Sequence, residues 1–423
     1  MLNSYYHLID MPHRYAFVPV LLLLFVSSVL GQTNYYADVQ PILYKHCIGC
    51  HRPNEIGPFS LLTFDDANKR GSMLAQVTSA RYMPPFHADT TFQRYQNERQ
   101  LSDADIATIA DWVATGKRKG RPKNGTEWKT MLADNAVFPQ PDFVLKMPDT
   151  LYIAANTQDQ YRLIVWPLNN DTAIYIRGIE LIPTATKQAH HCRIMLDTTH
   201  LYRNQHLLAI DSIPDNAQIQ TDLADAFFKG WAPGNTATYY PEGAAKRIPP
   251  HTDLILNMHY SATATAATDQ PEVRLYVSSA PPKKEVKTLV LDERNISNLP
   301  FIVPADQVTT FVMRSQPTPF PLIMLTVQPH AHALLRSVRA YIITPAGNLV
   351  PLLKINKWDF KWQQTYAFRT PLTLPKGSVI YAEFTYDNTS KNYANPYFPP
   401  RTAQFGWRTY DEMCNLIMEY IEE

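Results

Sequence analysis

The chain has 423 residues, with 39 Lys and Arg against 38 Asp and Glu, so its net charge is only +1. This balance argues against the strongly basic surface that nucleic acids or anionic membranes attract. The length suits about three domains. The 34 prolines, 24 tyrosines and 18 phenylalanines, against 14 glycines, favour a β-rich body.

Residues 1–31 are predicted to be an export signal. An apolar run (15–30) follows His13 and Arg14, and Val29-Leu30-Gly31 offers a cleavage site. The run is shorter than the roughly 20 residues that a bilayer-spanning helix needs. We therefore expect a periplasmic or secreted bacterial protein without stable membrane insertion; an uncleaved anchor is the alternative.

The stretch HCIGCH (46–51) places Cys47, Cys50 and His51 in a C-x-x-C-H arrangement. This spacing lets two thiols bond to one haem while the histidine becomes an axial iron ligand. A redox dithiol would need a βαβ context, and a zinc site would need a second ligand pair, but the next cysteine is Cys192. We therefore predict one covalent haem c.

Two helical patterns surround this motif. Apolar residues at helical spacing occupy 37–47, and a second pattern covers 101–116, with Ser102 as N-cap, Asp105 three residues later and Gly116 at its end. Together they predict a small all-α, cytochrome c-like domain over residues 32–118. The basic, apolar-poor stretch that follows predicts a linker over 119–138.

A methionine is the expected sixth iron ligand, because thioether ligation raises the reduction potential. RYMPPF (81–86) resembles the MPPW pattern found in the distal loop of many bacterial c-type domains, so Met83 is the predicted ligand. Met73 is the alternative, although its neighbours Leu74 and Val77 suggest a core methionine on a helix.

From about residue 135 the sequence consists of short β-type runs separated by turn residues, which is typical of all-β sandwiches. The predicted strands include 143–147, 161–166, 173–181, 253–260, 273–277, 322–327, 337–343 and 379–388.

Three of the strand regions carry histidines: AHHCRIML (189–196), NMHY (257–260) and PHAHALL (329–335). His330 and His332 are two residues apart, so they share one face of a strand and are able to bind one metal together. His190 and His191 are adjacent and would point to opposite faces of a regular strand. A metal shared by them requires a twist or a bulge. A single strand histidine is more often structural, so a metal site depends on these stretches meeting.

The histidine stretches, in this order and followed by DEMCN (411–415), resemble the copper type II, ascorbate-dependent monooxygenases. Peptidylglycine α-hydroxylating monooxygenase and dopamine β-monooxygenase are familiar members. The resemblance covers roughly residues 140–423, and KGWAPG (229–234), 240–260 and KWDFKWQ (357–363) resemble stretches of bacterial members. It implies two jelly-roll-like sandwich domains, here 139–290 and 291–423, with a solvent-filled cleft between them.

The resemblance also implies two copper ions. One would be held by His190, His191 and His259, and would store and pass an electron. The other would be held by His330, His332 and Met413, where the soft thioether favours Cu(I), the form that reacts with O2. These last three residues are the predicted catalytic set.

The sequence departs from the family in its cysteines and in its expected substrate contacts. Cys192 and Cys414 either pair with each other or are buried free thiols; we expect free thiols, since a disulfide needs Cα atoms within about 7 Å. Gln328 stands where peptide-processing members have a carboxylate-binding arginine, and Ile417 where they have a tyrosine. Peptidylglycine amidation is therefore not expected.

These features predict a multidomain copper monooxygenase that hydroxylates an aliphatic C–H bond with O2. Its electrons would come through the haem, from ascorbate, or from both. The expected partners are O2, an unknown small-molecule or peptide substrate and a redox partner for the haem, with no nucleic acid. The alternative is a copper- and haem-binding electron-transfer protein without hydroxylase activity.

Overall fold

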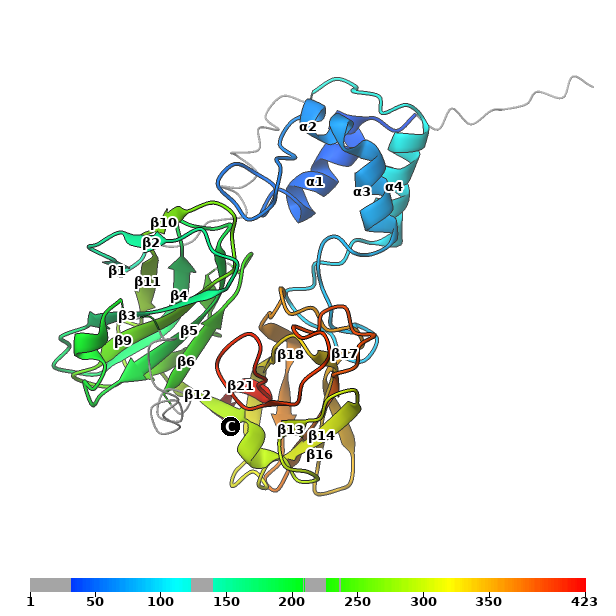
Figure 1. Ribbon diagram of the computed structural model, residues 1–423. Helices are drawn as coiled ribbons and strands as arrows, with labels where there is room; N and C mark the ends of the chain where they lie inside the picture. Colours follow the sequence, from blue (N-terminus) through cyan, green and yellow to red (C-terminus); the bar gives the residue numbers. More distant parts are fainter. Residues whose placement is uncertain (1–31, 123–139, 208, 210–225, 236) are drawn as a thin grey trace, which may run out of the picture.

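The computed structural model describes residues 32–122, 140–207, 209, 226–235 and 237–423. Figure 1 shows a helical region at one end and two β regions beneath it, one for each half of the remaining chain. The predicted export signal (1–31) and most of the predicted linker (119–138) lie outside the described residues. No helix in the described ranges is long and apolar enough to cross a membrane.

The helical region has a small core of its own. Tyr35, Leu43 and Trp112 are fully buried there. The predicted capping box is confirmed: the amide of Asp105 donates to Ser102 Oγ (3.1 Å), and the amide of Ser102 donates to the Asp105 carboxylate (3.3 Å). The elements are η1 (Tyr35–Val39), α1 (Gln40–His46), α2 (Phe64–Lys69), α3 (Gly71–Ser79) and α4 (Asp103–Ala114).

The N-terminal β domain is a sandwich. A sheet of order β3-β9-β5-β6 packs against the strands β1-β11-β4-β8, and apolar side chains from both layers share one core. The strands are β1 (Phe143–Lys146), β2 (Leu151–Ile153), β3 (Gln160–Pro167), β4 (Ile174–Ile182), β5 (Ala189–Asp197), β6 (Phe227–Trp231), β7 (Thr238–Tyr239), β8 (Ala244–Ile248), β9 (Asp253–Tyr260), β10 (Ala267–Asp269) and β11 (Glu272–Val277), and a 3-10 helix, η2, covers Arg203–Gln205.

The C-terminal β domain is a second sandwich, in which a sheet of order β14-β19-β16-β17 packs against β21-β15-β18. Its elements are η4 (Glu293–Asn295), β13 (Ile302–Val303), β14 (Val308–Arg314), β15 (Leu322–His330), β16 (Leu335–Ile343), β17 (Leu349–Ile355), β18 (Tyr366–Leu374), β19 (Val379–Asp387), β20 (Ala403–Gln404) and β21 (Asn415–Glu422). Each of the eight strands predicted above corresponds to one of these elements or to one in the preceding domain.

One strand joins the two sandwiches. β12 (Lys284–Leu291) pairs in parallel with β8 through residues 284–286 and antiparallel with β21 through residues 287–291. A continuous nine-stranded sheet therefore runs through both domains, and β12 lies between them in Figure 1. The predicted boundary at 290/291 remains a prediction, but it falls within a strand that belongs to both sandwiches.

A buried ionic cluster reinforces this junction. The Glu419 carboxylate on β21 accepts hydrogen bonds from Lys229 Nζ (2.7 Å), Lys246 Nζ (3.1 Å) and the Tyr240 hydroxyl (2.9 Å), all from the N-terminal β domain. Burial would raise the pKa of Glu419, but the two ammonium groups lower it to about 2, so this carboxylate is ionised. A buried ion needs partners of this kind, and here they come from the other domain.

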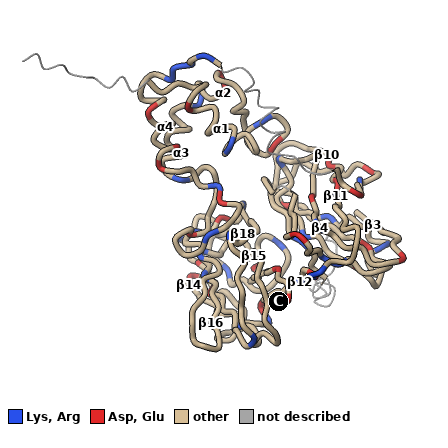
Figure 2. The backbone as a smooth tube through the Cα atoms, turned by 180° about the vertical axis from the view of Figure 1, so that it is seen from behind, with Lys and Arg blue, Asp and Glu red and all other residues tan. Residues whose placement is uncertain are grey.

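The segment between α3 and α4 leaves the helical region and packs into the C-terminal β domain. Phe86, Ala88 and Tyr95 belong to that domain's core, and the Tyr95 hydroxyl donates to the carbonyl of Leu352 (2.8 Å). The amide of Gln96 also donates to the carbonyl of Ala367 on β18 (2.8 Å). Figure 2, from behind, shows the same segment running down to β18. The helical region is thus anchored by side chains buried in another domain.

We predict that Tyr95→Ala destabilises the C-terminal β domain by about 3–5 kcal/mol, because it empties a large buried volume. Tyr393, whose side chain is 91% exposed, is the matched control, and Tyr393→Ala should change stability by less than about 0.5 kcal/mol. Urea unfolding followed by fluorescence measures both. Equal stabilities for the two variants would contradict the buried anchor.

Candidate functional site

The predicted three-histidine group is assembled by β5 and β9. In the ladder between them, Ala189 is paired with Tyr260 and His191 with His259, so two steps along β5 match one step along β9. The extra residue is His190, which makes this a β-bulge. The bulge is the irregularity that the adjacent histidines required, and it lets both rings reach the same side.

The Nδ1 atoms of these three histidines converge. Those of His190 and His191 lie 2.9 Å apart, and those of His259 and His191 lie 3.4 Å apart. The three side chains form a group whose ligand atoms all lie within 4.8 Å of one another. Imidazole nitrogens about 2 Å from one metal ion have separations of this size. The arrangement therefore fits a three-nitrogen metal site.

Asp159 orients His259. The His259 Nε2–H donates to the Asp159 carboxylate at 2.9 Å, which leaves the Nδ1 lone pair directed at the group. Burial raises the pKa of Asp159, but hydrogen bonds from His259 and Thr409 outweigh this, and the net shift is downward. An ionised carboxylate behind a ligand histidine fixes its tautomer and increases its basicity.

The second predicted pair, His330 and His332, has its Nε2 atoms available to a metal, whereas the three-histidine group has Nδ1 atoms available. His330, at the end of β15, donates from Nδ1 to Gln363 Oε1 (2.5 Å), and His332 donates from Nδ1 to the carbonyl of Asp411 (2.9 Å). Gln363 Nε2 donates to the carbonyl of Phe360 (3.0 Å), which fixes the amide with its oxygen toward His330. Both imidazoles therefore keep Nε2 as a free acceptor.

Glu412 brings the DEMCN segment to this pair. Its carboxylate accepts hydrogen bonds from the amides of His332 (3.0 Å) and Leu334 (2.7 Å). The β15–β21 ladder runs up to His330 opposite Asn415, and Met413 lies in the chain just before that last pair. Met413 is buried, and its carbonyl accepts a hydrogen bond from the Tyr386 hydroxyl (2.6 Å).

The two histidine groups lie against each other. The ring centroids of His191 and His330 are 5.4 Å apart, and the Phe360 ring lies 4.8 Å from that of His190 and 6.0 Å from that of His332. The solvent-filled cleft implied by the family resemblance is therefore wrong at the histidines: His259, His330 and His332 are buried. The shared sheet explains the difference, because β12 and β21 bring the two domains together here.

The surroundings keep these imidazoles neutral. Burial lowers the pKa of His190 to about 3 and that of His332 to about 4, and the pKa values of His191 and His330 lie well below the usual range for the same reason. The Arg193 guanidinium, stacked on Trp407 at 4.3 Å, adds to the effect on His330 and His332. Neutral imidazole is the form that binds metals.

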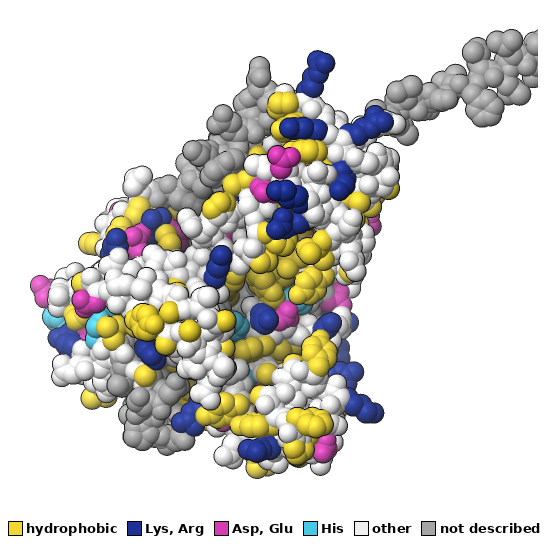
Figure 3. All heavy atoms as spheres, turned by 45° about the horizontal axis from the view of Figure 1, so that its top comes forward, with side chains coloured by type: hydrophobic (Ala, Val, Ile, Leu, Met, Phe, Trp, Pro, Cys, Tyr) yellow, Lys and Arg dark blue, Asp and Glu magenta, His cyan; other side chains and the backbone are white. Residues whose placement is uncertain are grey.

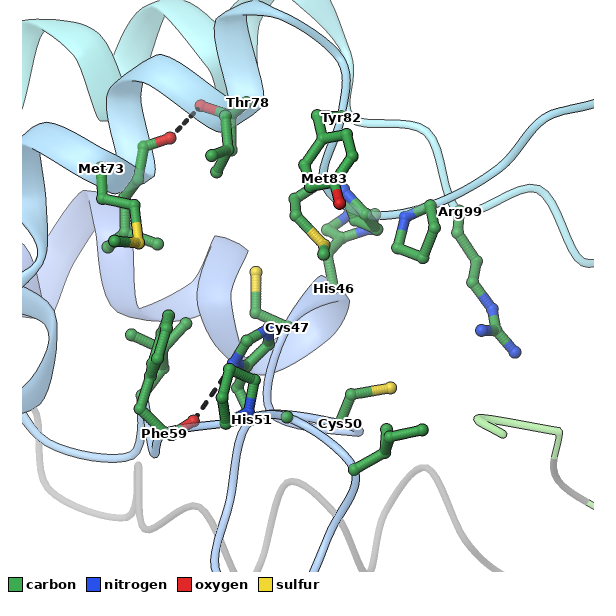
Figure 4. A pocket seen from close by; sticks show the side chains of 18 of the residues that line it. His46, Cys47, Cys50, His51, Phe59, Met73, Thr78, Tyr82, Met83 and Arg99 are labelled. Atoms are coloured by element: carbon green, nitrogen blue, oxygen red, sulfur yellow. Dashed lines mark hydrogen bonds between the residues drawn. The ribbon is translucent and has the colours of Figure 1, made fainter. Parts of the chain in front are cut away.

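Cys47, Cys50 and His51 line one cavity of about 330 Å³, together with Met73 and Met83 (Figure 4). His51 Nδ1–H donates to the carbonyl of Phe59 (3.1 Å), so Nε2 is available as a ligand. Two thiols, a histidine oriented through its second nitrogen and a mostly apolar lining fit a covalently bound haem. Figure 3 shows hydrophobic side chains gathered between the helical region and the C-terminal β domain.

Both candidate methionines reach this cavity. Met83 and Met73 carry their sulfur atoms toward it in Figure 4. The suggestion that Met73 is a core residue is wrong, because it is 50% exposed on α3. Met83 lies just after that helix, in the loop that leads to the anchor segment.

The two remaining cysteines and Gln328 are buried. Cys192 and Cys414 are free thiols, as predicted, and burial raises the pKa of each. Gln328 accepts a hydrogen bond from the Thr365 hydroxyl (2.9 Å), and a Cβ on Gly230 would lie 2.6 Å from its amide nitrogen. Gln328 thus fills the junction between the two β domains.

Four residues of the site were not singled out from the sequence: Asp159, Phe360, Gln363 and Glu412. Phe360 and Gln363 lie in KWDFKWQ and Glu412 in DEMCN, stretches that had been noted only for their resemblance to the family. Asp159 had no local signal, because its partner His259 is 100 residues away.

Residues 298–423 match the family model for the C-terminal domain of copper type II ascorbate-dependent monooxygenases. This stretch contains His330, His332 and Met413, and copper and ascorbate are cofactors of that family. No curated protein matches the chain.

Some solved structures are weakly similar. The major capsid protein P2 of bacteriophage PM2 is 11% identical over 66% of this chain and 97% of that chain, with a TM-score of 0.27. The VP2 subviral particle of infectious bursal disease virus is 8% identical over 67% of this chain and 72% of that chain (TM-score 0.20), and allantoicase is 13% identical over 57% and 83% (TM-score 0.18). Likeness at this level carries no argument about fold or function.

We predict that the metal-free protein loses stability as the pH falls below about 6.5. Between that value and about 4, the unfolded chain protonates the four histidines whose pKa is lowered (His190, His191, His330 and His332), while the folded chain keeps them neutral. Each of them therefore contributes a slope of about 1.4 kcal/mol per pH unit to the free energy of unfolding. Urea unfolding at several pH values should give a shallower slope for His332→Gln than for the wild type. The exposed His251 is the control, and His251→Asn should keep the wild-type slope. An unchanged slope in His332→Gln would contradict a neutral, buried His332.

Proposed function

We propose that the chain is a periplasmic or secreted copper-dependent monooxygenase that hydroxylates an aliphatic C–H bond with O2. One observation carries the proposal: His330 and His332, in the part of the chain that matches a copper monooxygenase domain, lie directly against the three-histidine group. Electrons would arrive through a haem c bound at Cys47 and Cys50, from ascorbate, or from both.

The side chains have separate tasks in this proposal. His190, His191 and His259 would hold one copper ion through Nδ1, with Asp159 fixing the orientation of His259. His330 and His332 would hold the other through Nε2, with Met413 as third ligand. Copper supplies the redox chemistry with O2 when bound. Gln363 and the carbonyl of Asp411 hold the second pair of rings, and Phe360 keeps water from the histidines.

Peptides that bind through a terminal carboxylate are not expected to be substrates. Gln328 cannot pair with a carboxylate as an arginine does, and it is already enclosed by Gly230 and Thr365. The substrate would therefore be recognised by other groups.

A second candidate is an electron-transfer protein that binds copper and haem without hydroxylating a substrate. The burial of the histidines favours it, because a C–H substrate must reach the copper held by His330 and His332, and both side chains are less than 10% exposed. The two candidates differ in whether product forms.

We predict that the wild-type chain binds two copper ions. We also predict that Met413→Ile forms no product, because isoleucine removes the thioether ligand. The measurements are metal analysis and the mass gain of one oxygen atom in a panel of small molecules and peptides, with ascorbate and O2. The haem spectrum should not change. Met324→Ile, the same change at a buried core methionine of β15, should keep both copper ions and any product.

Product formation that survives in Met413→Ile would contradict the catalytic assignment. A wild type that binds two copper ions and yields no product from any member of the panel would favour the electron-transfer candidate. One copper ion or none per chain would contradict both.

We predict that Cys47→Ser combined with Cys50→Ser abolishes covalent haem, because both thioether bonds are lost. Mass spectrometry of the denatured chain should show one haem in the wild type and none in this variant. Cys192→Ala combined with Cys414→Ala removes the other two cysteines and should keep the haem. Covalent haem in the first variant would contradict the attachment site.

A further inference from the structure

The connection between β17 and β18 contacts both candidate redox sites. It contains KWDFKWQ (357–363), and its side chains point in two directions within a few residues. Trp362 lines the cavity of Cys47 and Cys50, whereas Gln363, the next residue, is bonded to His330. We call residues 360–363 the bridging segment.

On the cavity side, the bridging segment is held in place by its neighbour. Gln364 Nε2 donates to the carbonyl of Pro85 (3.3 Å), and Pro85 lines the same cavity, two residues after Met83. Gln364 is buried, so this contact is shielded from water. Trp362 is thus a residue of the C-terminal β domain that closes a cavity built mainly by the helical region.

On the histidine side, the bridging segment makes two kinds of contact. The Gln363 amide oxygen accepts the hydrogen bond from His330 Nδ1 at 2.5 Å. The Phe360 ring packs against His190, His259 and His332, with centroid distances of 4.8, 6.2 and 6.0 Å. Within the bridging segment, Gln363 is the residue that is both hydrogen-bonded to a histidine ring and adjacent in sequence to a cavity residue.

We propose that Trp362 and Gln363 form the path by which an electron passes from a haem at Cys47 and Cys50 to the copper site of His330, His332 and Met413. The path consists of the Trp362 ring, one peptide unit, the Gln363 side chain and one hydrogen bond to His330. This inference rests on the proposed function and adds where the haem electron enters. The step transfers one electron: a ferrous haem becomes ferric, copper(II) becomes copper(I), and no bond forms or breaks.

A second route through the N-terminal β domain is longer. Gly234 lies beside Cys50, since a Cβ there would be 3.3 Å from Cys50 Sγ. From Gly234 the chain must run back three residues to Trp231, cross to Cys192 through the strand pairing, and then reach His191. The bridging segment therefore gives the more direct connection, and it leads to the two-histidine site, not to the three-histidine group.

Flash reduction of the haem in the full copper(II)-loaded chain, under anaerobic conditions, tests the proposal. Decay of the ferrous haem band reports electron transfer, and a copper-free sample gives the background. We expect Trp362→Ala and Gln363→Leu to slow the copper-dependent decay several-fold in samples matched for haem and copper content. Trp362→Phe, which keeps an aromatic ring, should slow it less. Lys357→Ala, at an exposed position five residues before Trp362, should leave the copper-dependent decay at the wild-type rate.

The point of entry is tested with His190→Ala, which removes a ligand of the three-histidine group. It should bind one copper ion fewer and keep the copper-dependent decay. Loss of the decay in His190→Ala, or wild-type decay in both Trp362→Ala and Gln363→Leu, would overturn the path. If the wild-type protein shows no copper-dependent decay, electron delivery by the haem fails as part of the proposed function.

Discussion

The pairing of β12 with both β8 and β21 is the constraint on which the site depends. Because one strand is hydrogen-bonded to each sandwich, the two domains are fixed edge to edge in a continuous sheet. Glu419 adds to this constraint, since its charge is balanced by Lys229 and Lys246 from the other domain. His191 and His330 meet as a result, although they come from separate cores.

The helical region is likewise fixed to the C-terminal β domain by direct contacts. Phe86 and Tyr95 are part of the C-terminal core, so the cavity of Cys47 and Cys50 is held against that domain by buried apolar contacts. Trp362 then reaches the cavity, and Gln363 reaches His330. A c-type haem attached at this cavity would be linked through Trp362 and Gln363 to the proposed copper ligands of the same chain, without needing an encounter with a second protein.

Local patterns predicted a large part of the structure. The capping box of Ser102 and Asp105, the strands at 253–260 and 379–388, and the need for an irregularity at His190 and His191 all follow from a few neighbouring residues. The family resemblance predicted Met413 as a third ligand beside His330 and His332, a prediction that sequence spacing alone could not make. The cleft was wrong, because the resemblance says nothing of how β12 joins the two sheets in this chain. Asp159, Gln363 and the burial of Tyr95 were missed because each depends on a partner distant in sequence.

The two histidine groups form one continuous buried site, and electron paramagnetic resonance of the chain loaded with two copper(II) ions tests this arrangement. Because the rings of His191 and His330 are in contact, we expect spin coupling between the ions, seen as a half-field transition and a loss of intensity relative to two isolated ions. His190→Ala, with one ion removed, should restore the spectrum of an isolated copper(II). Two independent, uncoupled signals in the wild type would show that the two histidine groups hold their ions in separate sites.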